Sequence, residues 1–177
     1  MARPAALQGT GGEIDKEARN MTELKLEANV TISDMNFGDE ASRRIKSYLG
    51  GRTGEDITNT KLRGILEMVN KIYSSASYSP GSRLSERHLG DIHYLKSKLA
   101  YEHKEDSVKR FIEHTGIMNP LEEIVKSGEK AKFLLYCRYM ESLVAYSRYH
   151  LAMNRAESQQ PRSGGNRNYG NQQGGRR

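Results

Sequence analysis

The sequence predicts an all-α protein, a compact bundle of five to six helices with disordered N- and C-terminal tails. Between about Ile57 and Leu151, apolar residues recur at spacings of three and four, the period of one helical face. No segment in that stretch alternates between apolar and polar residues for long enough to form a strand. The apolar residues are concentrated there, so we expect a modest core within the bundle domain, residues 37–153.

The N-terminal extension, residues 1–36, is mixed polar with scattered glycine and no sustained period, which predicts a mostly disordered segment. A short first helix is predicted within residues 38–51, where acidic residues occupy the first turn and a Gly-Gly pair ends it. A second helix is predicted over residues 58–75, whose apolar side chains share one face and whose Thr58 offers an N-cap. Residues 75–82 contain Pro and Gly and are expected to form a loop.

Three further helices follow the same period. The third is predicted over residues 83–103, with the buried stripe passing through His88. The fourth covers residues 106–115 and stops at Gly116, and the fifth lies within residues 119–128, with proline in its first turn and glycine at its end. The face of the third helix opposite its stripe carries aromatic and basic residues: Tyr94, Lys98 and Tyr101.

The last helix carries a narrow apolar seam whose members are spaced by four and three residues: Phe133, Cys137, Met140, Val144, Ser147 and Leu151. Other residues widen this seam over much of the circumference: Leu134, Tyr136, Leu143 and Ala145. A helix that is apolar on so many sides is normally the central helix of a bundle. We expect its tyrosines to lie beside the seam, where the ring packs and the hydroxyl finds a partner.

The C-terminal tail, residues 154–177, is rich in Arg, Gly, Gln and Asn and is expected to be disordered. It holds five arginines and one glutamate, so it carries +4 of the net charge of +6, and residues 1–153 carry only +2. The basic composition therefore does not by itself indicate that the folded part binds nucleic acid. Two interpretations of the tail stay open: RNA binding through charge and stacking, or a solubilising segment without a partner.

Several classes of site lack their sequence signals. No apolar run approaches a membrane span, and no secretory signal is evident, so we expect a cytoplasmic protein. The histidines form no metal-ligand pair on one helical face, and the glycine-rich stretches lack the order of a phosphate-binding loop, so we expect no metal or cofactor. The single cysteine, Cys137, lies on the buried seam and is not expected to act as a nucleophile.

One catalytic pattern is present. Arg83 with His88, and Arg87 with His93, match the Arg-x4–6-His spacing of HEPN ribonucleases, which are also small helical proteins. In that motif His assists proton transfer and Arg steadies phosphate charge. The motif is short, and chance matches are expected in a chain with 28 basic residues and five histidines. A helical ribonuclease remains the alternative hypothesis.

Basic residues on the predicted helices are the remaining candidates for phosphate contact. Lys61 and Arg63 flank the apolar face of the second helix, and Lys96 flanks the stripe of the third. Arg138 and Arg148 lie off the seam of the last helix. Their side chains have the reach to donate to phosphate. Spacing alone favours a solvated face with local ion pairs, such as Arg138 with a glutamate one turn away.

Three segments together resemble one family, the small subunit of the type III-A CRISPR (Csm) effector complex. TNTKLRGILEMVNKIY resembles its T-x-KLR-x-(I/L)L helix, and IHYLKSKLAYE followed by VKRFIEHTGI resembles the two helices that come next. FLLYCRYMESLVAYSRYH resembles the C-terminal signature, in which the run YME…LVAY is the most specific part. The resemblance covers about residues 57–151, and the order and separation of the segments also fit.

The resemblance implies a non-catalytic, all-helical RNA-binding subunit. Copies of it would stack head to tail beside other Csm-complex subunits that hold the guide RNA. In the guide RNA–target RNA duplex it would contact chiefly the backbone of the target strand, while base pairing supplies sequence recognition. The implied phosphate contacts are Lys61, Arg63, Lys96 and Arg138, which match the family motifs.

The chain departs from the family pattern after Tyr101, where Ala-Gly-Arg is common in the family and Glu102-His103-Lys104 stands here. Lys104 is the candidate substitute for the arginine, although lysine offers a point charge and not a bidentate fork. Arg148 is a further candidate for RNA contact on the last helix.

Overall fold

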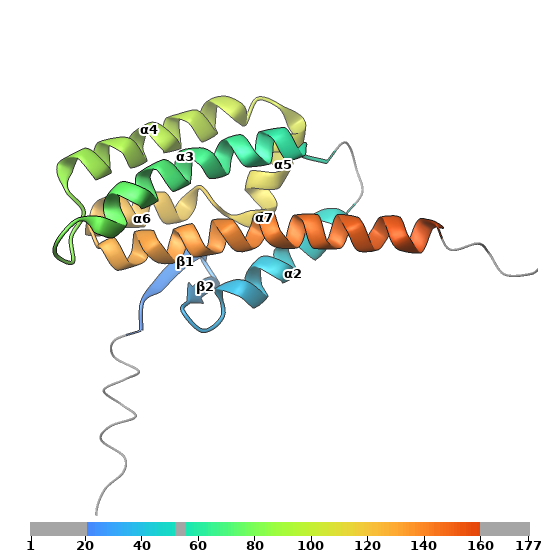
Figure 1. Cartoon of the computed structure of the whole chain (residues 1–177), viewed down its shortest axis with the longest axis horizontal. Coiled ribbons are helices and arrows are strands. Elements are labelled where there is room, and N and C mark those ends of the chain that lie inside the picture. Colours follow the sequence, from blue (N-terminus) through green and yellow to red (C-terminus); the bar gives the residue numbers. More distant parts are fainter. Residues whose placement is uncertain (1–20, 52–55, 160–177) are drawn as a thin grey trace, which may run out of the picture.

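The computed structural model describes residues 21–51 and 56–159 of the chain (Figure 1). In these residues a β-hairpin precedes six helices, which confirms the prediction of a mostly helical bundle. The elements are β1 (Glu23–Glu27), β2 (Val30–Ser33), α2 (Phe37–Gly50), α3 (Asn59–Tyr78), α4 (Glu86–Glu102), α5 (Asp106–Thr115), α6 (Asn119–Ser127) and α7 (Lys130–Gln159).

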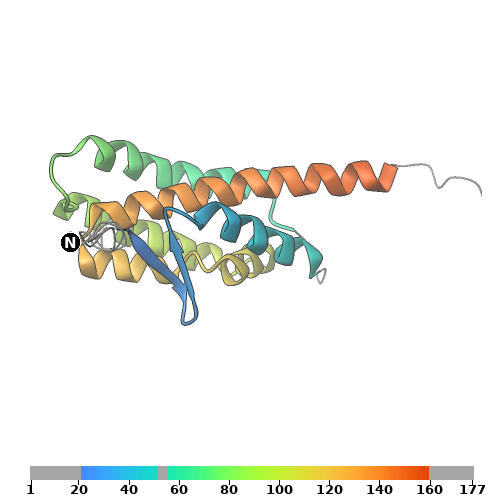
Figure 2. The same ribbon diagram turned by 90° about the horizontal axis from the view of Figure 1, so that it is seen from below.

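Helix α7 is the centre of the bundle. It packs against α2 on one side and against α3 and α6 on the other, and α3 lies between α7 and α4 (Figure 1). The seam predicted for this helix is buried through Ser147, and Leu151 is half-buried. Ala145, which was expected to widen the seam, is exposed. The C-terminal end of α7 projects beyond the other helices (Figure 2).

The helix boundaries follow from local capping. The Thr58 side chain accepts from the backbone N–H of Lys61 at the start of α3, as its sequence position predicts. Helices α5 and α6 end at Gly116 and Gly128, which adopt the left-handed conformation with φ of 67° and 63°. Helix α3 runs to Tyr78, so the loop that follows begins later than the predicted residue 75.

The β-hairpin corrects the prediction that residues 1–36 are mostly disordered. Strands β1 and β2 pair antiparallel, with an irregularity in register between Lys25 and Glu27. Leu24, Leu26 and Ile32 are fully buried beneath the hairpin. The alternate residues of β1 are exposed: Glu23, Lys25 and Glu27. This burial against the helices supplies the stability that a two-stranded hairpin lacks on its own.

The outer edge of β1 is covered by α6. The Asn119 side-chain amide donates to the backbone oxygen of Leu26 at 2.8 Å, and the Glu123 carboxylate accepts from the backbone N–H of Lys25 at 3.2 Å. Backbone groups at an exposed sheet edge would otherwise rely on water or another strand. The hairpin is therefore part of the bundle.

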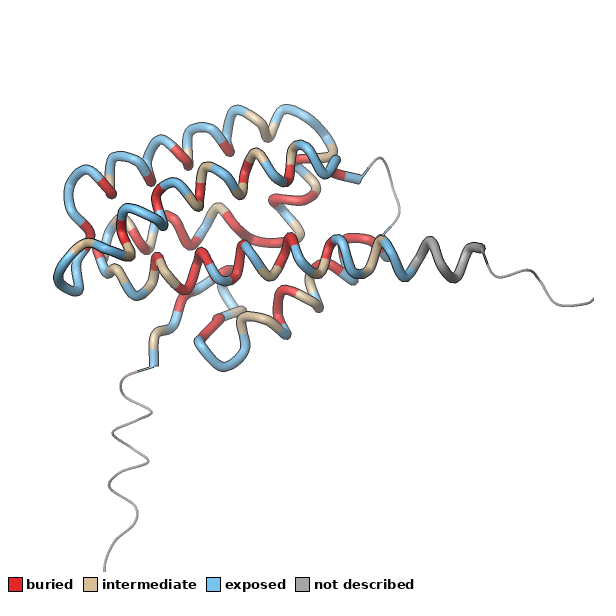
Figure 3. The backbone as a smooth tube through the Cα atoms, viewed as in Figure 1, coloured by how far each residue is buried: buried red, intermediate tan, exposed pale blue. Residues whose placement is uncertain are grey.

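The predicted tail also begins later than expected. Helix α7 continues to Gln159, past the predicted boundary at residue 153. The predicted disordered segments at residues 1–20 and 160–177 lie outside the described residues, as do residues 52–55. Figure 3 shows that buried positions gather on the inward faces of the helices, while the outer side of α4 is largely exposed.

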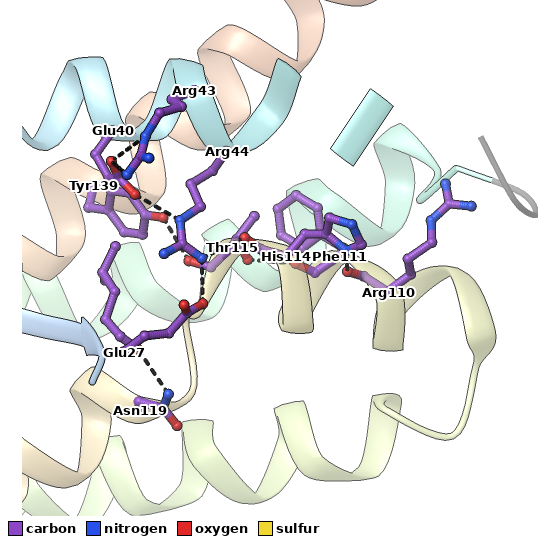
Figure 4. Close-up of polar contacts among 11 residues, drawn as sticks. Glu27, Glu40, Arg43, Arg44, Arg110, Phe111, His114, Thr115, Asn119 and Tyr139 are labelled. Carbon is purple, nitrogen blue, oxygen red and sulfur yellow. Dashed lines mark hydrogen bonds and ion pairs between the residues drawn. The ribbon is translucent and has the colours of Figure 1, made fainter. Parts of the chain in front are cut away.

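A guanidinium group joins the hairpin to two helices (Figure 4). The Arg44 side chain, only 12% exposed, donates to Glu40 at 2.8 Å and to Glu27 of β1 at 2.5 Å. It also donates to the backbone oxygen of His114 at 2.9 Å, in the last turn of α5. A cation at that position satisfies an orphan carbonyl and interacts favourably with the negative end of the helix dipole.

The Glu40 carboxyl is the acidic centre of this network. Burial alone would raise its pKa, but hydrogen bonds from Arg44 and Arg43 outweigh burial and lower the pKa below its ordinary value. Nearby, the Tyr139 hydroxyl donates to the backbone oxygen of Thr115 at 2.7 Å, which attaches the end of α5 to α7. The Arg44 network thus joins β1, α2 and α5, and Tyr139 joins the end of α5 to the central helix.

We expect Arg44→Met to lower the free energy of unfolding by about 2 kcal/mol, because it removes charged hydrogen bonds from partly buried carboxylates. Arg43→Met is the matched control, since Arg43 binds the same Glu40 carboxylate but is 68% exposed. Its loss should cost less than about 1 kcal/mol. Urea denaturation of both variants measures the difference, and equal losses would contradict the role of burial.

The ion pair between Glu40 and Arg44 also predicts that the free energy of unfolding depends on pH. Because the pKa of Glu40 is lower in the folded protein, its contribution to stability is present above the pKa of the unfolded chain, about 4.3. It is lost as the pH falls through the lower folded pKa. The stability difference between wild type and Arg44→Met should therefore narrow on acidification below about pH 4. Urea titrations at a series of pH values test this, and a constant difference would argue against it.

Candidate nucleic-acid interface

Lys61 lies in the first turn of α3 and is held by two carboxylates. Its ammonium group is 2.7 Å from Glu102 Oε2, at the end of α4, and 2.9 Å from Glu105 Oε2, just before α5. The hydrogen bond that Lys61 donates to Glu102, followed by the one it donates to Glu105, raises the pKa of Lys61 above its ordinary value. The Lys61 ammonium group is half-exposed and lies where the start of α3, the end of α4 and the start of α5 meet.

Two other predicted contacts also bridge elements. Lys96 of α4 binds Glu122 of α6 at 2.6 Å, and this hydrogen bond lowers the pKa of the Glu122 carboxyl. Arg138 of α7 binds Asp34, in the turn after β2, at 2.7 Å. Arg138 therefore pairs with the hairpin segment, whereas the sequence suggested a glutamate one turn away on its own helix.

The remaining predicted contacts differ in their surroundings. Arg63 and Arg148 are exposed and form no ion pair within the described part of the chain. The Lys104 ammonium lies 3.9 Å from the centre of the Tyr101 ring, and its hydrogen bond to the hydroxyl lowers the pKa of Tyr101. Lys61, Lys96 and Arg138 thus pair with carboxylates of different elements, and Lys104 lies over an aromatic ring.

The outer face of α4 combines aromatic and basic residues. Tyr94 and Tyr101 are 61% and 60% exposed, and Lys98 lies 5.5 Å from the centre of the Tyr94 ring. The sequence grouped Tyr94, Lys98 and Tyr101 by spacing. It did not indicate that Lys104 turns back onto Tyr101, because that contact depends on how the chain leaves the helix.

The geometry around His88 indicates a structural role. The ring is buried, its Nδ1 accepts from the backbone N–H of Ser85 at 3.3 Å, and its Nε2 lies 2.9 Å from the Ser75 hydroxyl. Since Nδ1 accepts, the proton of the neutral ring is on Nε2, which donates to Ser75. His88 thereby completes a capping box at the start of α4.

The other candidate reactive groups lie in two kinds of surroundings, exposed or buried. Arg83, Arg87 and His93, the other members of the ribonuclease-like pattern, are exposed. Burial raises the pKa of the Cys137 thiol well above its ordinary value, so it remains protonated and unreactive. Within the described residues, no cluster of His, Cys, Asp and Glu is arranged to hold a metal ion, and no helix is long and apolar enough to cross a membrane.

The fold and surface define a small helical protein with exposed or half-exposed cations on several of its helices. The model of the Csm2 type III-A family matches residues 39–152. The chain belongs to this family, which confirms the resemblance to the small subunit of the type III-A Csm effector complex. All six predicted RNA-contact residues lie within the matched range, and the hairpin lies outside it.

Individual relatives agree with this assignment. The CRISPR system Cms protein Csm2 of Enterococcus italicus is 36% identical over 124 residues, which are 66% of this chain and 89% of the relative. The protein of the same name from Mycobacterium tuberculosis is 31% identical over 99 residues, 55% of this chain and 78% of the relative. That of Streptococcus thermophilus is 28% identical over 121 residues, 67% of this chain and 94% of the relative.

We expect His88→Ala to lower the free energy of unfolding by about 1–2 kcal/mol, because it removes a buried ring and opens the capping box of α4. His93→Ala is the matched control on the same helix, since His93 is exposed. It should change stability by less than about 0.5 kcal/mol. Thermal and urea unfolding measure both, and a neutral effect of His88→Ala would refute the structural role.

Proposed function

We propose that this protein is a non-catalytic RNA-binding subunit of a type III-A CRISPR-Cas interference ribonucleoprotein. In this role its surface cations contact the phosphate backbone of the target RNA. The observation that carries the proposal is the family match over residues 39–152, a range that includes all six predicted contacts. The contacts are Lys61, Arg63, Lys96, Lys104, Arg138 and Arg148.

The ion pairs of the free protein are weak enough for an RNA phosphate to replace the carboxylate. Lys61, Lys96 and Arg138 each pair with carboxylates at or near the surface. Such pairs contribute only about 0–1 kcal/mol each, so a phosphate can displace the carboxylate at little cost. Neutralising phosphates also releases condensed counterions, which favours binding at low salt. Arg63 and Arg148 could contact phosphate without breaking an ion pair described in the structure.

Sequence recognition would belong to pairing between the guide RNA and the target RNA, with this subunit reading backbone and shape. Several copies would associate head to tail, which is a heterologous contact that can repeat until a different partner ends it. Other subunits of the Csm complex would hold the guide and carry out cleavage. We further propose a cytoplasmic location, where a lone buried thiol such as Cys137 stays reduced.

The structural role of His88 supports a non-catalytic subunit over the helical ribonuclease. A general base needs a ring nitrogen that can accept a proton from the reacting group. In His88 the accepting nitrogen is occupied by the backbone of Ser85, and the other nitrogen donates to Ser75. Metal-free RNA cleavage by the purified protein that disappears in His93→Ala would reinstate the ribonuclease hypothesis.

Replacing Lys61, Arg63, Lys96 and Arg138 together by Gln should weaken target-RNA binding by the assembled complex. For contacts to a single strand, the loss of four phosphate contacts per subunit should reduce the slope of log affinity against log salt by about 3 for each copy in the complex. Filter binding at a series of salt concentrations measures this slope. The substitutions remove only surface charge and ion pairs, so the bundle should remain folded.

A second quadruple variant controls for the change in net charge. It replaces four exposed basic residues on other elements by Gln: Lys25, Arg43, Lys46 and Lys126. This variant should keep most of the wild-type salt slope, because its residues do not match the family motifs. Normal target binding by the first variant, or equal losses in both, would contradict the proposed contacts.

A further inference from the structure

A hollow of about 260 Å³ lies between α3 and α4 and has an apolar floor. Ile65 and Met68 of α3 and Val108 of α5 form that floor, and Gly64 leaves its wall open. A side chain at position 64 would meet no heavy atom within 4 Å of its Cβ, so the space beside α3 is accessible and unfilled. The volume is smaller than the roughly 300–1,000 Å³ of sites for drug-sized ligands, and suits a single flat ring system.

Two ammonium groups lie at the rim of the hollow. Lys61 and Lys98 line it together with one carboxylate, Glu102, which already accepts from Lys61 at 2.7 Å. Lys61 has a second partner in Glu105, while the Lys98 ammonium lies over the exposed Tyr94 ring. A ligand that brings a negative charge beside an apolar ring would match this arrangement.

We propose that the hollow binds an unpaired nucleobase of the RNA strand, with Lys61 and Lys98 contacting the phosphates on either side. This inference rests on the proposed RNA-binding function and adds a second mode of contact to it. The polarizable thioether of Met68 forms favourable contacts with an aromatic ring, and the side chains of Ile65 and Val108 beside it carry no polar group that would select one base. Binding is therefore tolerant of sequence, as is usual for stacking sites on single strands.

The exposed tyrosines extend the same surface. Lys98 belongs both to the rim of the hollow and to the outer face of α4, where it approaches Tyr94. Tyr101 lies about two helical turns after Tyr94 on that face, and the Lys104 ammonium lies over its ring. Alternating lysines and exposed aromatic rings are the features with which proteins track single-stranded RNA. A protein side chain as occupant is less consistent with this surface, because lysine is depleted at the centres of protein interfaces.

Gly64→Leu tests the inference without removing any charge. The new side chain fills the hollow, and leucine is a better helix former than glycine, so the variant should fold at least as well as wild type. Gly38→Leu is the matched control, since Gly38 lies in α2 and its added Cβ also meets nothing within 4 Å. Thermal unfolding of the full chain verifies that both variants are folded.

Fluorescence anisotropy with a labelled single-stranded RNA, and with a duplex of the same sequence, measures the effect. Gly64→Leu should weaken single-strand binding about tenfold and leave duplex binding unchanged, because a paired base cannot enter the hollow. Gly38→Leu should match wild type on both RNAs. Wild-type binding of the single strand by Gly64→Leu, or an equal loss on both RNAs, would overturn the proposal.

Two further outcomes separate this inference from the proposed function. If the quadruple phosphate-contact variant binds target RNA normally while Gly64→Leu loses single-strand binding, the nucleobase proposal is supported and the assignment of the phosphate contacts is wrong. If Gly64→Leu binds both RNAs normally but no longer co-purifies with the other subunits, the occupant is a protein side chain and the nucleobase proposal is wrong.

Discussion

The burial of α7 over much of its circumference is the constraint from which the rest of the architecture follows. Phe133, Tyr136 and Tyr139 are fully buried, and they point in different directions around the helix. A helix with large buried side chains on several faces must be covered on each of them. Helices α2, α3 and α6 and the hairpin supply that cover, and Arg44 holds the hairpin, α2 and α5 together at their meeting point.

This central packing leaves the outer sides of the helices for charged groups. The cations of α3, α4 and α7 pair across element boundaries with carboxylates of α4, α6 and the β2–α2 turn. A bundle that draws most of its stability from α7 does not depend on these surface pairs, whose individual contributions are small. The pairs can therefore open when a phosphate competes for the cation, while the core keeps the helices in place.

The sequence predicted the helices and the central place of α7 because a long run of apolar residues at a single period leaves few alternatives. It failed at the hairpin, since the alternation in β1 spans only five residues and cannot be distinguished from a polar segment without knowledge of what covers it. The partner of Arg138 was missed for the same reason, because Asp34 is 104 residues away and is placed by that hairpin. The buried hydroxyl of Tyr136, which has no hydrogen-bond partner among the described residues, also departs from the expectation for the tyrosines of α7.

Only part of the candidate site could be predicted from the sequence, because the hollow depends on how α3 and α4 pack. Motifs predicted that Lys61 contacts phosphate, but the glycine at position 64 has no evident significance until α4 is seen to leave space beside it. Glycine in the interior of a helix costs about 1 kcal/mol relative to alanine, so its presence in α3 is unfavourable unless the opening has a use. A base in that opening would place its flanking phosphates beside the lysines, so that the charge contacts and the hollow would act on the same strand. Since both contacts are insensitive to base identity, they would hold a target in place and leave its selection to pairing with the guide.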